Sequence, residues 1–305
     1  MTKFDALDAG LVVAAHGRHV VVETPDAVRV LCHPRGKKNE AVVGDSVRWM
    51  PVGAGAGAEG VIERVEPRRN LMFRQDEMRT KQFAANLDQI LMLISGDPMF
   101  SESQLTRALI AAASAEIPAR IGLNKIDLPV AAAARERLRP YTAMGIEVTE
   151  LALTTDPAGA RERLLPLLQG RVTLVLGPSG SGKSTLINLL VPRADAQVGE
   201  ISQALHSGRH TTTTTTWYWL DDRRSGALID SPGFQEFGLR HIDGKLLPTL
   251  MPDLSKHLGH CRFYNCAHRQ EPGCGVREAV AAGKISPSRY KLYGEIQDEL
   301  AQTRW

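Results

Sequence analysis

Apolar and polar positions alternate over short stretches in residues 1–67, and Gly, Pro and Asn residues separate these stretches. The pattern is typical of β-strands bounded by turns. The predicted strands cover residues 11–15, 19–23, 28–32, 42–50 and 61–65. Five short strands in about 65 residues suit a small antiparallel barrel of the OB type. We therefore predict an N-terminal β-barrel (OB-fold) domain.

The pattern changes at about residue 84, where continuous apolar runs begin to alternate with segments of helical periodicity. Strands that are apolar throughout, separated by helices, are typical of a parallel sheet covered on both faces. The predicted strands cover residues 90–95, 119–124, 172–176 and 227–230, and the clearest helices cover 103–115 and 183–190. We predict a central α/β domain over residues 68–238.

The strand signal stops after about residue 239, and a group of Cys and His residues is followed by a helical pattern over 287–303. We predict that residues 239–305 form a third, mostly helical, metal-binding domain. The whole fold is thus expected to be multidomain, with a barrel, an α/β domain and a helical unit in that order.

Composition agrees with a globular protein, since 43% of residues are apolar and 23% are charged. No segment approaches the roughly 18 uncharged apolar residues of a membrane span, and the first residues do not resemble a secretion signal. Four cysteines are too few for a disulfide scaffold at this length. We expect a cytoplasmic monomer with no membrane contact.

The net charge of +3 is too small to indicate a nucleic-acid partner by itself. Basic residues do gather at 35–38, at 68–81 and along the last fifty residues. Such runs are more often solvated surface than binding sites. Charge alone therefore leaves both interpretations open.

A glycine-rich loop follows the predicted strand 172–176 and opens the helix after it, which is the context of a phosphate-binding loop. Its residues are Gly177, Pro178, Ser179, Gly180, Ser181, Gly182, Lys183 and Ser184, followed by Thr185. The glycines let backbone N–H groups face phosphates, and the helix N-terminus favours anions. Lys183 is then expected to reach the β and γ phosphates, and the Ser184 hydroxyl to bind Mg²⁺.

A second motif, at the carboxyl end of the predicted strand 119–124, chooses the base. Its residues are Asn124, Lys125, Ile126 and Asp127. The Asp127 carboxylate can accept hydrogen bonds from guanine N1–H and N2–H₂, whereas adenine offers an acceptor and a C–H there. Because the wrong base would leave a buried acceptor unpaired, this motif favours GTP over ATP.

A third motif, Asp230 to Gly233, ends the predicted strand 227–230. We expect Asp230 to hold Mg²⁺ through water and the Gly233 N–H to face the γ phosphate. One residue of the threonine run 211–216 is a further candidate ligand, and we choose Thr212. The run is equally compatible with the start of an exposed strand.

The position after Gly233 holds Phe234, whereas many GTPases carry there a Gln that orients the attacking water. We therefore expect slow intrinsic hydrolysis with help from another group. The candidates are His210 and a group supplied by a partner. Together the predicted catalytic residues are Lys183, His210, Asp230 and Gly233.

The order of the motifs is unusual, because the base motif precedes the phosphate loop. In the usual GTPase order the phosphate loop comes first and the base motif comes last. The sequence therefore predicts a circularly permuted GTPase domain.

The cysteine group has the spacing C-x4-C-x-H-x5-C, at Cys261, Cys266, His268 and Cys274. Three thiolates and one imidazole suit a closed, tetrahedral structural Zn²⁺ site. His257 and His260 lie nearby and compete for the single imidazole position. The sequence predicts one zinc ion.

These elements in this order resemble the ribosome small-subunit-dependent GTPase family over nearly the whole chain. The resemblance also rests on Val43-Gly44-Asp45, on residues 85–89, on 208–212 and on 271–273 within the cysteine group. It implies a Mg²⁺-dependent GTPase that binds the small ribosomal subunit and its rRNA, is stimulated by it, cycles between GTP and GDP, and acts in late subunit maturation.

Two positions depart from the family pattern. Ser181 stands where a valine is usual, and residues 151–153 read Leu-Ala-Leu where a Ser-Ala pair would help to hold guanine. Only the Ala152 backbone is carried over from that pair.

Two other functions remain possible from the sequence. An ATPase of the ABC type would share the phosphate loop, and a non-hydrolysing RNA-binding module would share the barrel and the cysteine group. An ABC ATPase would also need a Leu-Ser-Gly-Gly-Gln signature, which is absent. The complete set of Lys183, Ser184 and Asp230 argues against a module without hydrolysis.

Overall fold

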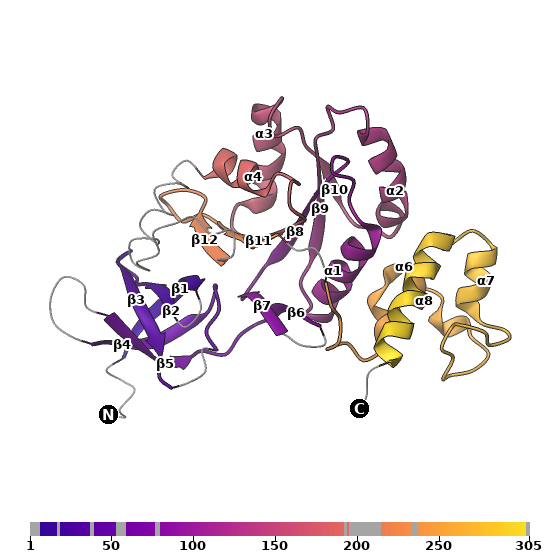
Figure 1. Ribbon diagram of the computed structural model, residues 1–305, viewed down its shortest axis with the longest axis horizontal. Coiled ribbons are helices and arrows are strands. Elements are labelled where there is room, and N and C mark those ends of the chain that lie inside the picture. The colour runs from indigo at the N-terminus through magenta and orange to yellow at the C-terminus, as the bar shows by residue number, and fades with distance from the viewer. Residues whose placement is uncertain are drawn as a thin grey trace.

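The computed structural model describes residues 7–16, 19–36, 40–52, 59–76, 80–191, 194, 215–233 and 237–302. Figure 1 shows a barrel at the N-terminus, a sheet flanked by helices in the middle and a helical unit at the C-terminus. This is the predicted multidomain fold.

Five N-terminal strands form the barrel: β1 (Asp8–His16), β2 (His19–Glu23), β3 (Arg29–Pro34), β4 (Ser46–Val52) and β5 (Glu59–Val65). Their order is β1-β2-β3-β5-β4, and pairing of β4 with β1 closes the barrel. Alternate side chains point inward and fill it. The buried set is Val12, Val20, Val22, Cys32, Ala41, Val47, Trp49 and Ile62. The predicted barrel is confirmed, although its fourth strand begins at Ser46 and not at residue 42.

A tight turn precedes β4 and explains the later start of that strand. Gly44 has φ of +92°, and its N–H donates to the Val12 carbonyl at 2.9 Å. The fully buried Asp45 carboxylate accepts two hydrogen bonds from Arg68, at 2.7 and 2.8 Å. This turn therefore ties the barrel to the chain that leaves it.

A hairpin of β6 (Leu71–Gln75) and β7 (Thr80–Ala85) connects the barrel to the central domain. The sequence pattern did not predict it. Its Phe83 ring stacks on Phe237, with ring centroids 5.8 Å apart. The hairpin is thus stabilised by a segment more than 150 residues further along the chain.

The central sheet has the order β10-β9-β8-β11-β13-β12. Its strands are β8 (Gln89–Ser95), β9 (Ala119–Asn124), β10 (Val148–Glu150), β11 (Val172–Leu176), β12 (Thr215–Trp219) and β13 (Ala227–Asp230). Neighbouring strands are parallel except β12, which is antiparallel to β13. The four predicted strands are confirmed. β10 and β12 were not predicted.

Two helices cover each face of this sheet (Figure 1). They are α1 (Glu102–Ser114) and α2 (Ala131–Ala143) on one face, and α3 (Pro157–Leu168) and α4 (Lys183–Leu190) on the other. Alternate residues of β8 serve the two faces, since Met92 packs with α1 and α2 while Leu93 packs with α3 and α4. Residues buried on both faces make the strand apolar throughout, as the sequence showed.

The C-terminal unit contains short helical turns and two longer helices. These elements are η1 (Leu247–Leu250), α6 (Pro252–Ser255), η2 (Leu258–His260), α7 (Gly275–Ala281) and α8 (Pro287–Ala301). The predicted helix 287–303 is thereby confirmed as α8. No helix in the described part of the chain combines the length and apolar character needed to cross a membrane.

Candidate functional site

The phosphate-loop and base motifs meet at the carboxyl edge of the sheet. Strand β8 lies between β9 and β11, so the loops that follow β9 and β11 are two strands apart. Asn124 joins them: its Nδ2 donates to the Ser181 carbonyl at 3.0 Å, and its Oδ1 accepts the Leu153 N–H at 3.1 Å. One buried side chain therefore connects three loops that are far apart in sequence.

In the rest of the base motif, Lys125 and Ile126 make structural contacts, whereas the carboxylate of Asp127 is exposed. Lys125 adopts a positive φ of 62°, and its Nζ donates to the Asp97 carbonyl. The Ile126 N–H donates to the Leu151 carbonyl at 3.2 Å. Asp127 is exposed. Its carboxylate is therefore accessible to a ligand, while its neighbours fix the backbone beside it.

The glycines of the loop are required by close contacts. A Cβ at Gly177 would lie 2.1 Å from the Leu93 carbonyl oxygen, and one at Gly182 would lie 2.4 Å from Asn124 Nδ2. Gly180 and Gly182 also have φ of +80° and +104°, a region in which side chains are strained. The loop is thus packed directly against β8 and the base motif.

Ser181, the residue that departs from the family pattern, is fully buried. Its hydroxyl donates to the Pro178 carbonyl at 3.0 Å. The hydroxyl is therefore satisfied inside the loop, and the substitution leaves no unpaired polar group. Ser184 and Thr185 are exposed in the first turn of α4, and Ser179 is exposed at the top of the loop.

The Lys183 ammonium lies inside the loop and donates to the carbonyls of Gly177 at 2.9 Å and Pro178 at 3.0 Å. Burial lowers its pKa, and the charge of Asp230 partly offsets this. Burial likewise raises the pKa of Asp230 to about 6, against the opposing effect of Lys183. Asp230 Oδ1 is buried and has no hydrogen-bond partner among the described residues. Such an unpaired carboxylate oxygen fits a position prepared for a cation or its water.

The turn after Asp230 lies against the phosphate loop. The Ser231 hydroxyl donates to the Val175 carbonyl at 3.0 Å and so fixes the turn to β11. A Cβ at Gly233 would lie 3.3 Å from both Lys183 Nζ and the Ser179 nitrogen. The predicted residues Lys183, Asp230 and Gly233 are therefore brought together.

Two predicted site residues, His210 and Thr212, lie outside the described residues. The described chain resumes at Thr215, which begins β12 with Thr216, and both side chains are buried. The end of the threonine run is thus a buried strand and not an exposed one.

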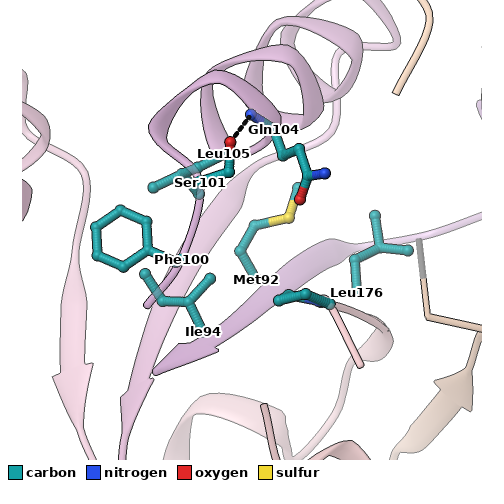
Figure 2. Close-up of a pocket in the computed structure, with 9 residues that line it drawn as sticks. Met92, Ile94, Phe100, Ser101, Gln104, Leu105 and Leu176 are labelled. Carbon is teal, nitrogen blue, oxygen red and sulfur yellow. Dashed lines mark hydrogen bonds between the residues drawn. The ribbon is translucent and has the colours of Figure 1, made fainter. Parts of the chain in front are cut away.

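A small apolar cavity of about 10 Å³ lies beneath the phosphate loop. Figure 2 shows Met92, Ile94 and Leu176 from the sheet facing Phe100 and Leu105. Ser101, Gln104, Gly177 and Pro178 complete its lining. The volume matches about one water molecule, so the cavity is a packing gap and not a nucleotide site.

The four predicted metal ligands meet in the C-terminal unit. The ligand atoms of Cys261, Cys266, His268 and Cys274 lie within 4.8 Å of one another. Nδ1 of His268 is 3.4 Å from the Cys261 sulfur and 3.5 Å from the Cys274 sulfur. Three sulfurs and one imidazole nitrogen at this spacing are the donor set of a tetrahedral zinc site. His257 and His260 do not belong to this group of described residues.

The backbone that carries His268 is held by three side chains. Tyr290 and Tyr293 on α8 donate to the carbonyls of His268 and Ala267 at 2.7 and 2.8 Å. The Glu271 carboxylate accepts backbone N–H groups of residues 267, 269 and 270, and these bonds hold its pKa at about 2. The ligand loop is therefore ordered by contacts that do not involve a metal.

Comparisons with known proteins decide the family. The model of the RsgA GTPase family matches residues 65–240. The chain is 57% identical over 304 residues to the small ribosomal subunit biogenesis GTPase RsgA of Variovorax paradoxus strain S110, covering 98% of this chain and 94% of that one. The chain belongs to the RsgA GTPase family.

Further relatives of this RsgA GTPase family member agree. The protein of the same name from Bordetella pertussis strain Tohama I is 53% identical over 296 residues, 97% of each chain. Among solved structures, YjeQ from Thermotoga maritima matches with a TM-score of 0.72 at 29% identity, over 98% of this chain and all of the other. YloQ, described as a circularly permuted GTPase, matches with a TM-score of 0.69 at 23% identity, over 100% and 99% of the two chains, and supports the fold alone.

Sequence reasoning missed two residues that shape the site of this RsgA family member. Leu153 contributes its N–H to Asn124, and Asp97 contributes its carbonyl to Lys125. Both act through the backbone, so their side chains carry no recognisable signal. Both follow shortly after a strand, β10 or β8, at the ligand-binding edge of the sheet. Leu153 also lies in residues 151–153, where the family resemblance places a guanine contact.

Proposed function

We propose that the protein hydrolyses GTP with Mg²⁺, coupled to binding of the small ribosomal subunit in late maturation of that subunit. The observation that carries the proposal is the contact of Asn124 with Ser181, which places the base motif beside the phosphate loop. The names of the relatives, small ribosomal subunit biogenesis GTPases, support the partner.

At the nucleotide, Asp127 binds the guanine edge and the backbone of Gly177 to Gly182 surrounds the phosphates. Lys183 contacts the β and γ phosphates, and Ser184 with Thr185 begins the helix that faces them. Ser184, Asp230 and Thr212 would hold Mg²⁺, which would offset the negative charge of the β and γ phosphates. The unpartnered Asp230 oxygen supports this assignment.

Hydrolysis is slow in the isolated protein, because the residue after Gly233 is not the usual Gln. Gly233 presents its N–H to the γ phosphate, and His210 assists the attacking water. Single-turnover hydrolysis by a His210→Ala variant tests this role. Equal rates for the variant and the parent protein would remove His210 from the mechanism.

The C-terminal cluster holds one structural Zn²⁺ through Cys261, Cys266, His268 and Cys274. The domains are residues 1–67, 68–238 and 239–305, which form the barrel, the GTPase domain and the zinc domain. Metal analysis of His268→Ala beside His260→Ala tests the ligand set. Loss of zinc from the His260 variant alone would contradict it.

The zinc loop supports direct contact with rRNA. Tyr264 is fully exposed, at 102% of its reference area, and Phe263 is exposed beside it. The Arg262 guanidinium lies 5.5 Å from the centre of the Phe263 ring. Exposed aromatic rings beside arginine are suited to stack on unpaired bases.

Binding of labelled rRNA fragments tests that contact. Tyr264→Ala should weaken binding roughly tenfold, the effect of losing one stacked base. Tyr264→Phe keeps the ring and should bind like the parent. Equal weakening by both variants would indicate that the hydroxyl, and not stacking, makes the contact.

The protein acts as a cytoplasmic monomer without membrane contact. The sequence composition and the soluble nature of the proposed partner support this assignment. Light scattering of the purified protein tests the monomer.

The test of the whole proposal is hydrolysis of GTP and ATP with and without small ribosomal subunits. GTP preference and stimulation by subunits are expected. Preference for ATP would favour an ABC-type ATPase, and RNA binding without hydrolysis would favour a simple RNA-binding module.

Base recognition has its own sharper test in Asp127→Asn. Xanthine carries a carbonyl where guanine carries its 2-amino group, so an amide at residue 127 should favour the xanthine nucleotide over GTP. The exposed barrel residue Asp26 offers a matched control, since Asp26→Asn should leave the preference for GTP intact. An unchanged preference in the Asp127 variant would remove Asp127 from the base site.

A further inference from the structure

The barrel is joined to the GTPase sheet through the edge strand β12 (Figure 1). On one side β12 pairs with β13, where Thr216 lies opposite Asp230. On its other side β12 pairs with β1, where the same Thr216 lies opposite Ala14. A residue of the barrel, a residue of the edge strand and the candidate magnesium carboxylate therefore stand in one row across three strands.

The other end of β12 is held by a buried carboxylate from the barrel. Glu23, the last residue of β2, is only 5% exposed. Its Oε1 accepts the Trp219 Nε1–H at 2.9 Å and pairs with Arg224 at 3.1 Å. Its Oε2 pairs with Arg29 at 3.1 Å. We call Glu23, Arg29, Trp219 and Arg224 the Glu23 clasp.

The Glu23 carboxylate links two domains, because it binds side chains from both. Arg29 comes from the barrel, whereas Trp219 ends β12 and Arg224 lies in the turn that leads to β13. The Arg224 guanidinium also lies 5.2 Å from the Trp219 ring centre. A buried carboxylate is stable only with such partners, so the barrel and the β12–β13 hairpin are held in one relative position.

Two attachments at opposite ends of a strand fix its orientation as well as its place. Backbone pairing at Thr215 and Thr216 holds the end of β12 next to Asp230, and the clasp holds the end next to Trp219. Without the clasp, the hairpin can tilt about the backbone pairing. Strand β13 is also paired with β11, where Asp230 lies opposite Val175. Loss of the clasp would therefore loosen the β12 side of Asp230, where Thr216 lies opposite it.

We propose that Glu23 is a positioning residue for GTP hydrolysis, which holds the β12–β13 hairpin so that Asp230 is aligned for Mg²⁺. Binding of a small subunit to the barrel would then change the position of Asp230 through the Glu23 clasp. This inference rests on the proposed function, since it concerns the regulation of the same site.

The test compares the parent and Glu23→Gln in the full-length protein by two readouts. Hydrogen exchange of residues 215–230 without nucleotide or Mg²⁺ should be faster in the variant. GTP hydrolysis is then measured across Mg²⁺ concentrations with and without small subunits. The amide oxygen still accepts from Trp219, but the charge that pairs with both arginines is lost. The variant should need about tenfold more Mg²⁺ for half-maximal hydrolysis, and its stimulation by subunits should fall by a similar factor, as expected for loss of one charged hydrogen bond. KM for GTP at saturating Mg²⁺ should stay within about twofold, because the variant leaves the base and phosphate loops intact.

Glu66 supplies the matched control. It is a barrel carboxylate that also pairs with two arginines, Arg48 at 3.0 Å and Arg64 at 2.7 Å, on strands away from β12. Glu66→Gln should leave the Mg²⁺ requirement unchanged. If Glu23→Gln folds poorly, Trp219→Phe removes the donor to Glu23, keeps an aromatic ring beside Arg224, and should also raise the Mg²⁺ requirement.

The outcomes separate the inference from the function on which it rests. The inference alone would be overturned if the parent protein hydrolyses GTP and the Glu23 and Trp219 variants need the same Mg²⁺ concentration as the parent. Equal shifts in the Glu23 and Glu66 variants would do the same, because they would indicate a general effect of barrel stability. A parent that hydrolyses no GTP under any condition would overturn both.

Discussion

The two units that flank the GTPase sheet are attached to it in different ways. The barrel continues the sheet, since β1 pairs with β12 by backbone hydrogen bonds. The zinc unit, residues 239–305, contacts the helices of the sheet domain through side chains, since Arg289 on α8 donates to Thr106 on α1 at 2.6 Å. Within the unit, Arg289 pairs with Asp253 on α6 at 2.8 Å. The barrel is therefore coupled to the strands beside Asp230, and the zinc unit to the helices near the base motif.

The turn from Asp230 to Gly233 lies shortly before the cysteine group in sequence. This order favours direct transmission of a change at the turn to residues 239–305. In the structure, the chain after this turn first binds the β6 hairpin: the Gln75 N–H donates to Gly238 at 3.2 Å, and the Arg240 N–H to Gln75 at 3.0 Å. A movement of the turn would therefore displace the β6–β7 hairpin as well as the chain that leads to residues 247–305.

The largest effect is expected at the zinc-unit attachment. Asp253→Ala leaves the Arg289 guanidinium buried without its carboxylate, and breaking a buried pair in this way costs about 3–5 kcal/mol. Arg289 is only 2% exposed. Hydrogen exchange of residues 287–301 should therefore accelerate strongly, while exchange in the barrel strands stays unchanged.

The exposed pair Lys291–Glu295 on the same helix is the control. Glu295→Gln should change stability by less than about 1 kcal/mol. Faster exchange throughout the barrel in Asp253→Ala would show that the two attachments are not independent.

The next largest effect is expected at Asp230, on the barrel side. Its carboxylate is buried, no residue in the described part of the chain bonds to Oδ1, and burial raises its pKa to about 6. Each pH unit of difference from an ordinary aspartate is worth about 1.4 kcal/mol, so ionisation costs the metal-free fold roughly 3 kcal/mol at pH 7. Asp230→Asn should therefore raise the free energy of unfolding while abolishing Mg²⁺-dependent hydrolysis.

The sign of the pH dependence follows from the raised pKa. The parent loses stability as pH rises from about 4 to above 6, because the folded state resists ionisation more than the unfolded state. Thermal unfolding of parent and variant in a chelator should converge near pH 4 and diverge toward pH 7. A variant less stable than the parent at pH 7 would mean that the Lys183–Asp230 attraction outweighs burial.

Much of the fold was readable from the sequence where one physical requirement determines the residue types. Strands β8, β9, β11 and β13 are buried on both faces, so apolar runs mark them almost to the residue. The strand β10 was missed because it has three residues, too few to show a period. β12 was missed because its burial depends on β1, which is two hundred residues away.

The candidate site divides in the same way. The phosphate loop and the cysteine group were readable because phosphate and metal chemistry demand fixed residue types at fixed spacing. The roles of Glu23 and Asp97 were not, because a buried glutamate or a backbone carbonyl becomes meaningful only through partners brought by the fold. Asp45 lies between these cases: its motif was visible, but its pairing with Arg68 was not.

The smallest effect that still separates the two attachments is expected at Gly44, in the turn that ties the barrel to the chain leaving it. Its φ is +92°, and a Cβ there would lie 2.2 Å from the Ala85 carbonyl oxygen. Gly44→Ala should cost roughly 2 kcal/mol of stability through strain and displacement of that carbonyl. Gly36, with φ of +111° and no atom within 4 Å of its Cβ position, gives the control, because Gly36→Ala carries the strain without the contact.

Hydrogen exchange should show faster opening of residues 40–52 in the Gly44 variant than in the Gly36 variant, with the zinc unit unaffected in both. Equal exchange in the two variants would mean that the contact with Ala85 contributes nothing to holding this turn.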